Sequence, residues 1–135
     1  MARAAEDLNA YLDQMMEAEG LSAEQVILFG FSQGTMMSLQ VAPRRAEPFA
    51  CVVGFSGRLL APERLQEEMT VKMPVILIHG DADDVVPYTD MEKAAEALLA
   101  AGFDVYTHTM ERTAHGIAPD GLQQAYAFMA HILKG

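Results

Sequence analysis

The stretch VILFGFSQG, from Val26 to Gly34, joins an apolar run directly to a turn in which two glycines surround a serine. Good helix formers follow until Pro43, where a helix has to end because proline lacks an N–H and its ring clashes with the preceding turn. A buried strand over residues 26–29, a tight turn over 30–34 and a helix over 35–41 are therefore predicted. This order is the setting of a G-x-S-x-G nucleophile elbow, which favours Ser32 as a nucleophile over a plain turn serine.

The residues around Ser32 have separate physical roles in such an elbow. Gly30 and Gly34 are expected because the backbone turns so sharply that a side chain at either position would collide with the neighbouring strand or helix. Gln33 follows the nucleophile, and its backbone N–H lies at the positive end of the new helix. We predict that this N–H binds the oxyanion of the reaction.

Further along the chain, strands and helices alternate. Residues 50–55, 75–79 and 103–108 are apolar or β-rich and are predicted to be buried strands. Helices are predicted over the first twenty residues, ending at a Gly20 cap, over 62–69, over 88–101 and over about 122–133. The alternation implies right-handed crossovers and a parallel sheet of about four strands, so the fold class is α/β. With no linker-like segment, residues 1–135 are expected to form a single domain.

Composition and charge exclude several classes of protein. Nine basic and nineteen acidic residues give a formal net charge of −10, which disfavours binding to nucleic acid and stable anchoring to anionic membranes. The apolar runs are far too short to span a bilayer, and the first nine residues lack the apolar core of a secretory signal. The single cysteine, Cys51, precludes an internal disulfide and is expected to be a buried thiol. A cytoplasmic location is the resulting expectation.

A carboxylate-rich loop, HGDADDVVP from His79 to Pro87, follows the third predicted strand. In hydrolases with a nucleophile elbow, the acid and then the histidine follow the serine along the chain. We predict that Asp83 is the acid that orients the histidine. Asp81 is expected to form the turn, and Asp84 to be a solvated neighbour or a helix cap.

Among the four histidines, His115 is predicted to be the general base. It lies in a loop over residues 112–120, between the last strand and the last helix, where the base of this architecture belongs. His79, His108 and His131 lie at strand ends or on the final helix, and a structural role is expected for each. Of these three, His79 is expected to lie nearest the site.

No second motif competes with this constellation. Ser56 lacks the glycine two residues after it that an elbow requires, and is expected to form a strand-end turn beside the pocket. The sequence has no metal-ligand spacing, phosphate loop or dinucleotide fingerprint, so neither a metal nor another cofactor is expected. A flavodoxin-like binding domain would use the loop after its first strand for phosphate, but the Ser-Gln-Gly turn lacks the Ser/Thr-rich character of that role.

Three blocks together resemble the phospholipase/carboxylesterase family of α/β-hydrolases, which includes the acyl-protein thioesterases. The blocks are GFSQG at 30–34, HGDADDVVP at 79–87 and AHGI at 114–117, and the similarity runs through the whole chain. Carried over residue by residue, the resemblance places the nucleophile at Ser32, the acid at Asp83 and the base at His115. It also implies an α/β-hydrolase fold, of which this chain forms the C-terminal portion.

The resemblance implies a carboxylic ester hydrolase of the serine esterase type. Such an enzyme needs no metal ion and acts on small-molecule carboxylic esters or thioesters with short- to medium-length acyl chains. The serine attacks the acyl carbon, and water then cleaves the acyl-enzyme. Phe31, Val86 and Ile117, apolar residues of the three blocks, are expected to contact the substrate.

The chain is expected to depart from the family pattern at its start. Family members resemble one another in having several strands and a His-Gly-rich loop before the helix with which this chain begins. That loop usually supplies a second oxyanion donor, whose loss would cost on the order of 100- to 1000-fold in rate. The strand over 26–29 would also have a bare edge, which predicts a homo-oligomer. An impaired fragment that serves only as an assembly or binding module is therefore the alternative to an active esterase.

Overall fold

Four strands form one sheet in the computed structural model, which describes residues 2–134. They are β1 (Ile27–Phe31), β2 (Cys51–Phe55), β3 (Val75–Gly80) and β4 (Val105–Met110). The strands are parallel, and their spatial order, β1-β2-β3-β4, follows their order in the sequence. The predicted α/β class with about four parallel strands is confirmed.

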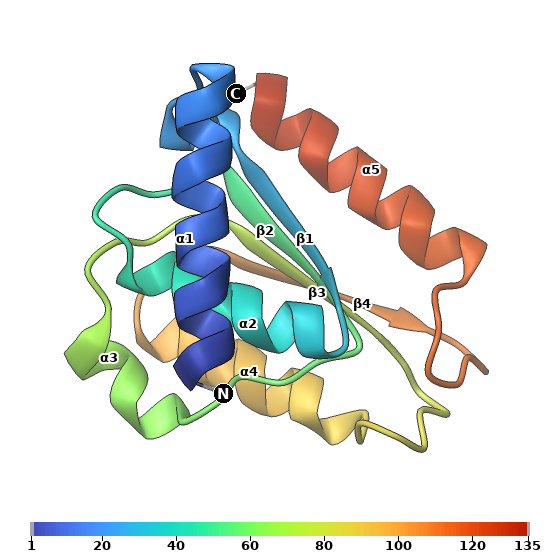
Figure 1. The fold of residues 1–135 in the computed structure, drawn as a ribbon. Helices are drawn as coiled ribbons and strands as arrows, with labels where there is room; N and C mark the ends of the chain where they lie inside the picture. Colours follow the sequence, from blue (N-terminus) through green and yellow to red (C-terminus); the bar gives the residue numbers. More distant parts are fainter. Residues whose placement is uncertain (1, 135) are drawn as a thin grey trace.

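Helices cover both faces of this sheet (Figure 1). They are α1 (Ala2–Glu19), α2 (Gln33–Val41), α3 (Leu65–Glu68), α4 (Thr89–Ala100) and α5 (Pro119–Lys134). α2 and α4 pack on one face, with α1 against α2, and α5 packs on the opposite face. Because all the strands run in one direction, their carboxyl ends and the loops that follow them meet at a single edge of the sheet, where ligands bind in α/β folds.

The two larger of the buried apolar clusters within residues 2–134 lie on opposite faces of the sheet and hold it between its helices. On the α2 and α4 side, Val52 and Leu77 belong to one cluster with Leu39 and Leu98. The buried cluster on the α5 side consists of Cys51, Val53, Phe55, Ile76, Ile78, Met110, Ala125 and Phe128. Every residue of β2 and β3 is buried, which explains why these strands appear in the sequence as continuous apolar runs.

Several boundaries differ from the predictions. β1 continues through Gly30 to Phe31 because both residues keep their register with β2, so the chain bends at Ser32 and not over the whole of 30–34. The segment predicted as a helix over 62–69 is a 3-10 turn, Pro62–Arg64, followed by the short α3. The end of the first helix is as predicted, with Gly20 in the left-handed region at φ +66°.

The last strand is also displaced from its predicted position. β4 covers 105–110 and not 103–108. Phe103 does not pair in the sheet because its N–H donates to the carbonyl of Leu98, 3.0 Å away, as part of the cap of α4. His108 therefore lies inside the strand and not at its end.

β1 is an edge strand of the sheet in the part of the chain that the structure describes. Beside it runs a groove of about 500 Å³ between α1, α2 and β1, lined mainly by apolar side chains. Tyr11 and Phe29 line this groove and are 62% and 45% exposed. The edge that the sequence predicted to be bare is therefore unpaired within residues 2–134.

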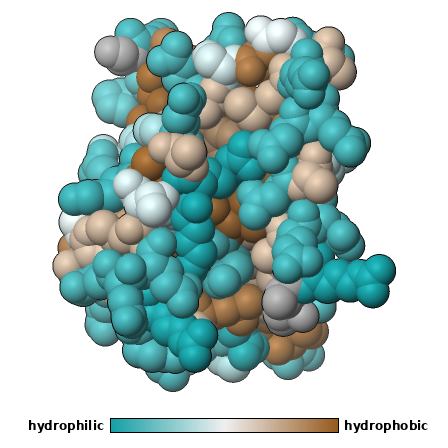
Figure 2. All heavy atoms as spheres, turned by 60° about the vertical axis from the view of Figure 1, so that its left-hand side comes forward, coloured by the Kyte–Doolittle hydropathy of each residue, from teal (hydrophilic) through white to brown (hydrophobic). Residues whose placement is uncertain are grey.

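The face turned forward in Figure 2 is mostly hydrophilic, with apolar patches between the polar residues. None of the helices within residues 2–134 is long and apolar enough to cross a membrane.

Candidate active site

Ser32 forms a sharp bend between β1 and α2. Its backbone has φ 55° and ψ −115°, a conformation that is costly for a residue with a side chain. Two hydrogen bonds hold it there: the Ser32 N–H donates to the carbonyl of Phe55 at 2.8 Å, and the Met36 N–H donates to the carbonyl of Ser32 at 3.1 Å. The predicted strand-to-helix elbow is therefore present, with the serine at the start of the helix.

The two glycines of the motif differ in what surrounds them. A Cβ atom at Gly30 would lie 2.6 Å from the backbone of both Gly34 and Thr35, so a side chain cannot fit there. A Cβ atom at Gly34 would meet nothing within 4 Å. The predicted collision is therefore right for Gly30 and wrong for Gly34, because Gly34 faces the open groove beside β1.

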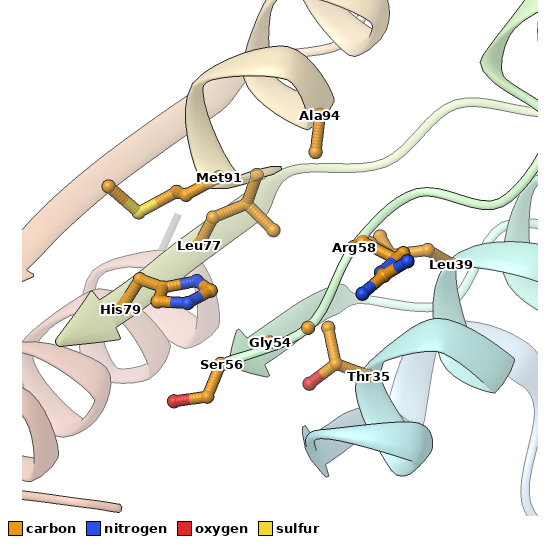
Figure 3. A pocket seen from close by; sticks show the side chains of 10 residues that line it. Thr35, Leu39, Gly54, Ser56, Arg58, Leu77, His79, Met91 and Ala94 are labelled. Carbon is orange, nitrogen blue, oxygen red and sulfur yellow. The ribbon is translucent and has the colours of Figure 1, made fainter. Parts of the chain in front are cut away.

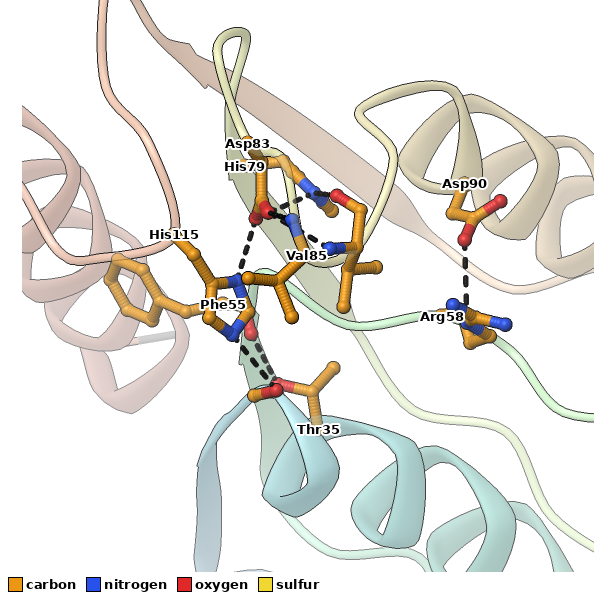
Figure 4. Close-up of polar contacts among 10 residues, drawn as sticks. Thr35, Phe55, Arg58, His79, Asp83, Val85, Asp90 and His115 are labelled. Carbon is orange, nitrogen blue, oxygen red and sulfur yellow. Dashed lines mark hydrogen bonds and ion pairs between the residues drawn. The ribbon is translucent and has the colours of Figure 1, made fainter.

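Ser32, His115 and Asp83 lie in one line of hydrogen bonds. His115 Nε2 is 3.0 Å from Ser32 Oγ, and His115 Nδ1 is 2.8 Å from Asp83 Oδ2. Figure 4 shows His115 between Asp83 and the first turn of α2. The three residues follow β1, β3 and β4, so the parallel sheet brings together side chains that are up to 83 residues apart in the sequence.

Backbone groups hold the carboxylate of Asp83 from its other side. The N–H groups of Val85 and Val86 both donate to Asp83 Oδ1, each at 2.9 Å. The side chain has no solvent exposure, and this burial acts to raise the pKa of Asp83. The hydrogen bonds from His115, Val86 and Val85 together outweigh burial, so the pKa is lowered from its usual value of 3.8. Asp83 is therefore ionised at neutral pH, and its Oδ2 accepts a hydrogen bond from the Nδ1–H of His115.

The neighbouring aspartates of the loop have other partners. Asp81 Oδ1 accepts a hydrogen bond from the N–H of Arg112 at 2.8 Å, which ties the loop after β3 to the loop after β4. Asp84 is exposed. Gly80 lies between these loops, where a Cβ atom would overlap the carbonyl oxygens of Thr113 and Ala114. Asp81 lies in the turn closed by the hydrogen bond from the Asp83 N–H to the Gly80 carbonyl, as expected, and its carboxylate also ties this turn to the segment that precedes His115.

The other histidines lie in different surroundings. His79 is 1% exposed at the end of β3, and its Nε2 is 2.9 Å from the carbonyl oxygen of Val86. His108 Nε2 pairs with Asp120 Oδ2 at 2.7 Å in an exposed position, and this hydrogen bond lowers the pKa of Asp120. His131 lies on α5. The expectation that His79 lies nearest the site is correct, because it contacts the same loop that carries Asp83.

The other residues predicted for the site belong to the segments that carry Ser32, Asp83 and His115. Gln33 begins α2, where the first N–H groups have no partner within the helix. The ring of Phe31 lies 4.9 Å from that of His115 and is partly exposed, and Ile117 is 44% exposed. Val86 is 3% exposed and packs with Met36 and Met37, so in this structure it offers little surface to a ligand.

Thr35 was not identified by sequence reasoning, although it supports the elbow. Its hydroxyl donates to the carbonyl of Phe55 at 2.8 Å, and the side chain is 1% exposed. Its methyl group fills the space over Gly54 and Gly57, where Cβ atoms would come within 2.7 and 2.6 Å of it. A polar residue directly after the motif, opposite two glycines of the next strand end, was the available signal.

A cavity of about 10 Å³ is lined by polar side chains, among them His79, Ser56, Thr35 and Arg58, and by apolar residues of the sheet and of α2 and α4 (Figure 3). Ser56 has φ 52° and is fully buried directly after β2, which fits the predicted strand-end turn. Its Oγ finds no hydrogen-bond partner among residues 2–134. No group of three or more His, Cys, Asp or Glu side chains within this described range is placed to hold a metal ion.

Comparison with known proteins relates the whole chain to esterases. A family model described as Phospholipase/Carboxylesterase matches residues 1–133. An acyl-protein thioesterase 1 from Gibberella zeae is 28% identical over 127 residues, which cover 88% of this chain and 54% of that protein. The esterase YpfH from Escherichia coli is 35% identical over 108 residues, which cover 78% of this chain and 44% of that protein. The chain therefore spans about half the length of these curated relatives.

Solved structures agree with this relationship. The crystal structure of esterase PE8 superposes with a TM-score of 0.95 at 43% identity, covering 97% of this chain and 61% of that one. The crystal structure of Arabidopsis thaliana SOBER1 shares the fold, with a TM-score of 0.89 at 22% identity, covering 98% of this chain and 64% of that one. Together with the match over residues 1–133, the α/β fold and the nucleophile elbow, these similarities show that the chain belongs to the phospholipase/carboxylesterase family.

Proposed function

We propose that this chain hydrolyses carboxylic esters or thioesters of small molecules, with Ser32 as nucleophile, His115 as general base and Asp83 as the orienting acid. The observation that carries the proposal is the pair of hydrogen bonds at His115, 3.0 Å to Ser32 Oγ and 2.8 Å to Asp83 Oδ2. A serine hydroxyl is a weak nucleophile unless an adjacent base removes its proton, and a histidine oriented by a carboxylate is that base.

The reaction follows from the positions of these atoms. Ser32 Oγ bonds to the acyl carbon of the substrate while its proton passes to His115 Nε2, and the N–H of Gln33 stabilises the oxyanion. The protonated His115 then gives this proton to the departing alkoxide or thiolate, which leaves an acyl-enzyme. In the second half, His115 takes a proton from water, the resulting hydroxide attacks the acyl carbon, and the proton returns to Ser32 as the acid leaves. The negative charge of Asp83 stabilises the imidazolium form of His115 in both halves.

The surroundings of Ser32 favour an apolar acyl group of short to medium length. Phe31 and Ile117 are partly exposed apolar side chains, and the ring of Phe31 lies 4.9 Å from that of His115. Val86 packs behind this surface with Met36 and Met37 and supports it from a buried position. Relatives named as esterases and acyl-protein thioesterases support both ester and thioester substrates.

Hydrolysis of p-nitrophenyl esters tests this proposal. The parent chain and a Ser32→Ala variant would be compared on the acetate, butyrate, octanoate and palmitate esters. We expect measurable turnover by the parent that is highest among the shorter chains, and loss of this turnover in the variant. Equal rates for the parent and the variant would contradict the proposal and favour the alternative, a chain that retains these residues only in an assembly or binding module.

We further infer that the bare edge of β1 pairs with β1 of a second copy of this chain, which gives a homo-oligomer. The support is the unpaired strand edge within residues 2–134 and the apolar groove beside it, where Tyr11 and Phe29 are exposed. Light scattering at high protein concentration tests this proposal, and a clean monomer would contradict it. A charged substitution in the groove, Phe29→Lys, is expected to return the assembly to the monomer.

The cytoplasmic location expected from the sequence stays a prediction.

A further inference from the structure

His79 makes two contacts through a single nitrogen atom. Its Nε2 lies 2.9 Å from the carbonyl oxygen of Val86 and 3.3 Å from Asp83 Oδ2. The side chain is 1% exposed, and the side chain of Asp83 has no exposure, so water does not compete for these contacts. In Figure 4 the His79 ring lies against the Asp83 carboxylate, on the side away from His115.

The contact with Val86 fixes which nitrogen of His79 carries a proton. A backbone carbonyl only accepts hydrogen bonds, so Nε2 has to be the protonated nitrogen in order to donate to it. The same nitrogen lies 3.3 Å from Asp83 Oδ2, a contact in addition to its hydrogen bond with Val86. This oxygen is the one that accepts the hydrogen bond from His115.

Val86 links His79 to the other carboxylate oxygen as well. The Val86 N–H donates to Asp83 Oδ1 at 2.9 Å, while the Val86 carbonyl accepts from His79. Two hydrogen bonds at Val86 thus hold the loop from residue 83 to residue 86, one to the Asp83 carboxylate and one from the His79 imidazole. A rotation of the carboxylate would break the first contact, and a movement of Val86 would break the second.

The imidazole is itself held in one orientation. The ring of Tyr88 packs edge-on against it, with the ring centres 6.0 Å apart at an interplanar angle of 87°. It also lines the small cavity with Ser56, Leu77 and Met91 (Figure 3). A buried hydrogen-bond donor of fixed direction can keep a catalytic carboxylate in place. The residues that surround the catalytic groups fix the geometry of those groups through packing and hydrogen bonds.

We infer that His79 is a positioning residue, which holds the carboxylate of Asp83 toward His115 through the Val86 carbonyl and through direct contact with Asp83 Oδ2. It touches neither the substrate nor Ser32 and acts through Asp83. This inference rests on the proposed function, because it assigns His79 a part in the same reaction.

Two nearly isosteric substitutions separate positioning from packing. His79→Gln keeps an N–H donor close to the place of Nε2, whereas His79→Met fills a similar volume without a donor. The parent and both variants would be assayed for kcat and KM on p-nitrophenyl butyrate, for the rate of labelling by a fluorophosphonate probe, and for Tm. His108→Met is the matched control, since it removes a histidine that also contacts a carboxylate but lies outside the site.

We expect kcat and the labelling rate of His79→Met to fall by about 10- to 100-fold, the cost of a small misplacement of a catalytic group, while KM stays unchanged. His79→Gln is expected to recover most of the lost rate, and His108→Met to match the parent. If His79→Met does not fold, His79→Asn replaces it, because its amide sits on a stem too short to reach Val86, and the same loss is expected.

Three results would overturn the inference. The first is a His79→Met variant with the kcat of the parent. The second is an equal loss in the Gln and Met variants together with an equal drop in Tm, which would mean that the ring serves packing alone. The third is a parent that neither reacts with the probe nor hydrolyses the ester. This result overturns the proposed function itself. It is distinguished from the other two because the parent shows no activity in either assay, before any variant is compared.

Discussion

Asp83 Oδ2 lies 2.8 Å from His115 Nδ1, a contact between residues 32 positions apart that joins the loop after β3 to the loop after β4. The carboxylate is fully buried, whereas the imidazole keeps 17% of its side chain exposed. The charge is thus hidden from water, and the ring that it orients reaches the surface at Ser32. In the proposed reaction, this arrangement would stabilise the imidazolium that forms when Ser32 gives its proton to His115.

The substitution Asp83→Asn is expected to abolish most of the activity. An amide in place of the carboxylate favours the wrong tautomer of His115, and in other serine hydrolases this change lowers kcat by about 10⁴-fold. KM should change little, because Asp83 does not reach the substrate. Ester hydrolysis by purified variants measures this effect. The exposed neighbour Asp84 provides the control, and an equal loss in Asp84→Asn would show that the acid had been assigned to the wrong residue.

The two glycines of the elbow should respond in opposite ways to alanine. Gly30→Ala places a methyl group 2.6 Å from rigid backbone, and overpacking of this kind costs about 1–3 kcal/mol of the free energy of unfolding. Gly34→Ala meets open space in the first turn of α2, where alanine is the better helix former by up to about 1 kcal/mol. Urea unfolding of both variants measures the difference. A Gly34→Ala variant as unstable as Gly30→Ala would contradict the geometry of the bend.

Asp83 should also contribute to the pH dependence of stability. Its pKa is lowered in the folded chain from the usual 3.8, so the folded state binds fewer protons than the unfolded state once the pH falls below about that value. The stabilisation is therefore complete above the unfolded pKa and is lost as the pH falls through the lower folded pKa. Urea unfolding between pH 2.5 and 5 should give a steeper loss of stability for the parent than for Asp83→Asn. Parallel curves for these two proteins, with Asp84→Asn as reference, would argue against this coupling.

Cys51 is expected to be unreactive in the folded chain. Burial at the start of β2 raises the pKa of the thiol from 9.0 to about 11, and the side chain has no exposure, so the reactive thiolate is scarce at pH 8. Ellman's reagent should therefore titrate one thiol per chain in denaturant and none in the native protein. Rapid reaction of the native protein would mean that the α5 side of the sheet opens readily.

The three residues that the sequence proposed for the site lie within hydrogen-bond distance of one another, whereas several predicted boundaries of the elements are displaced. Ser32, Asp83 and His115 were identifiable because each follows a strand in a distinctive block, and a parallel sheet brings such positions to one edge. The end of β1 was placed two residues early because glycine is a poor strand former. The pairing of Gly30 with Gly54, which extends the strand, is a tertiary contact that the local sequence does not report.

Other features depended on contacts that no local pattern encodes. The open space at Gly34 exists because this glycine faces the groove beside β1, where no further strand pairs within residues 2–134. The link between His79 and Asp83 requires the loop to fold back until the Val86 carbonyl reaches the imidazole. The sequence shows a histidine four positions before an aspartate, and this spacing alone does not distinguish such a loop from a turn of helix.

Labelling of Ser32 by a fluorophosphonate probe is the most direct test of the central claim, because it reports an activated serine without requiring the natural substrate. The parent chain and Ser32→Ala would be incubated with the probe, and the intact masses read afterwards. We predict one adduct on the parent and none on the variant, which would mean that His115 and Asp83 activate Ser32. A folded parent that gains no adduct, or a folded Ser32→Ala variant that gains one as readily as the parent, would contradict the account.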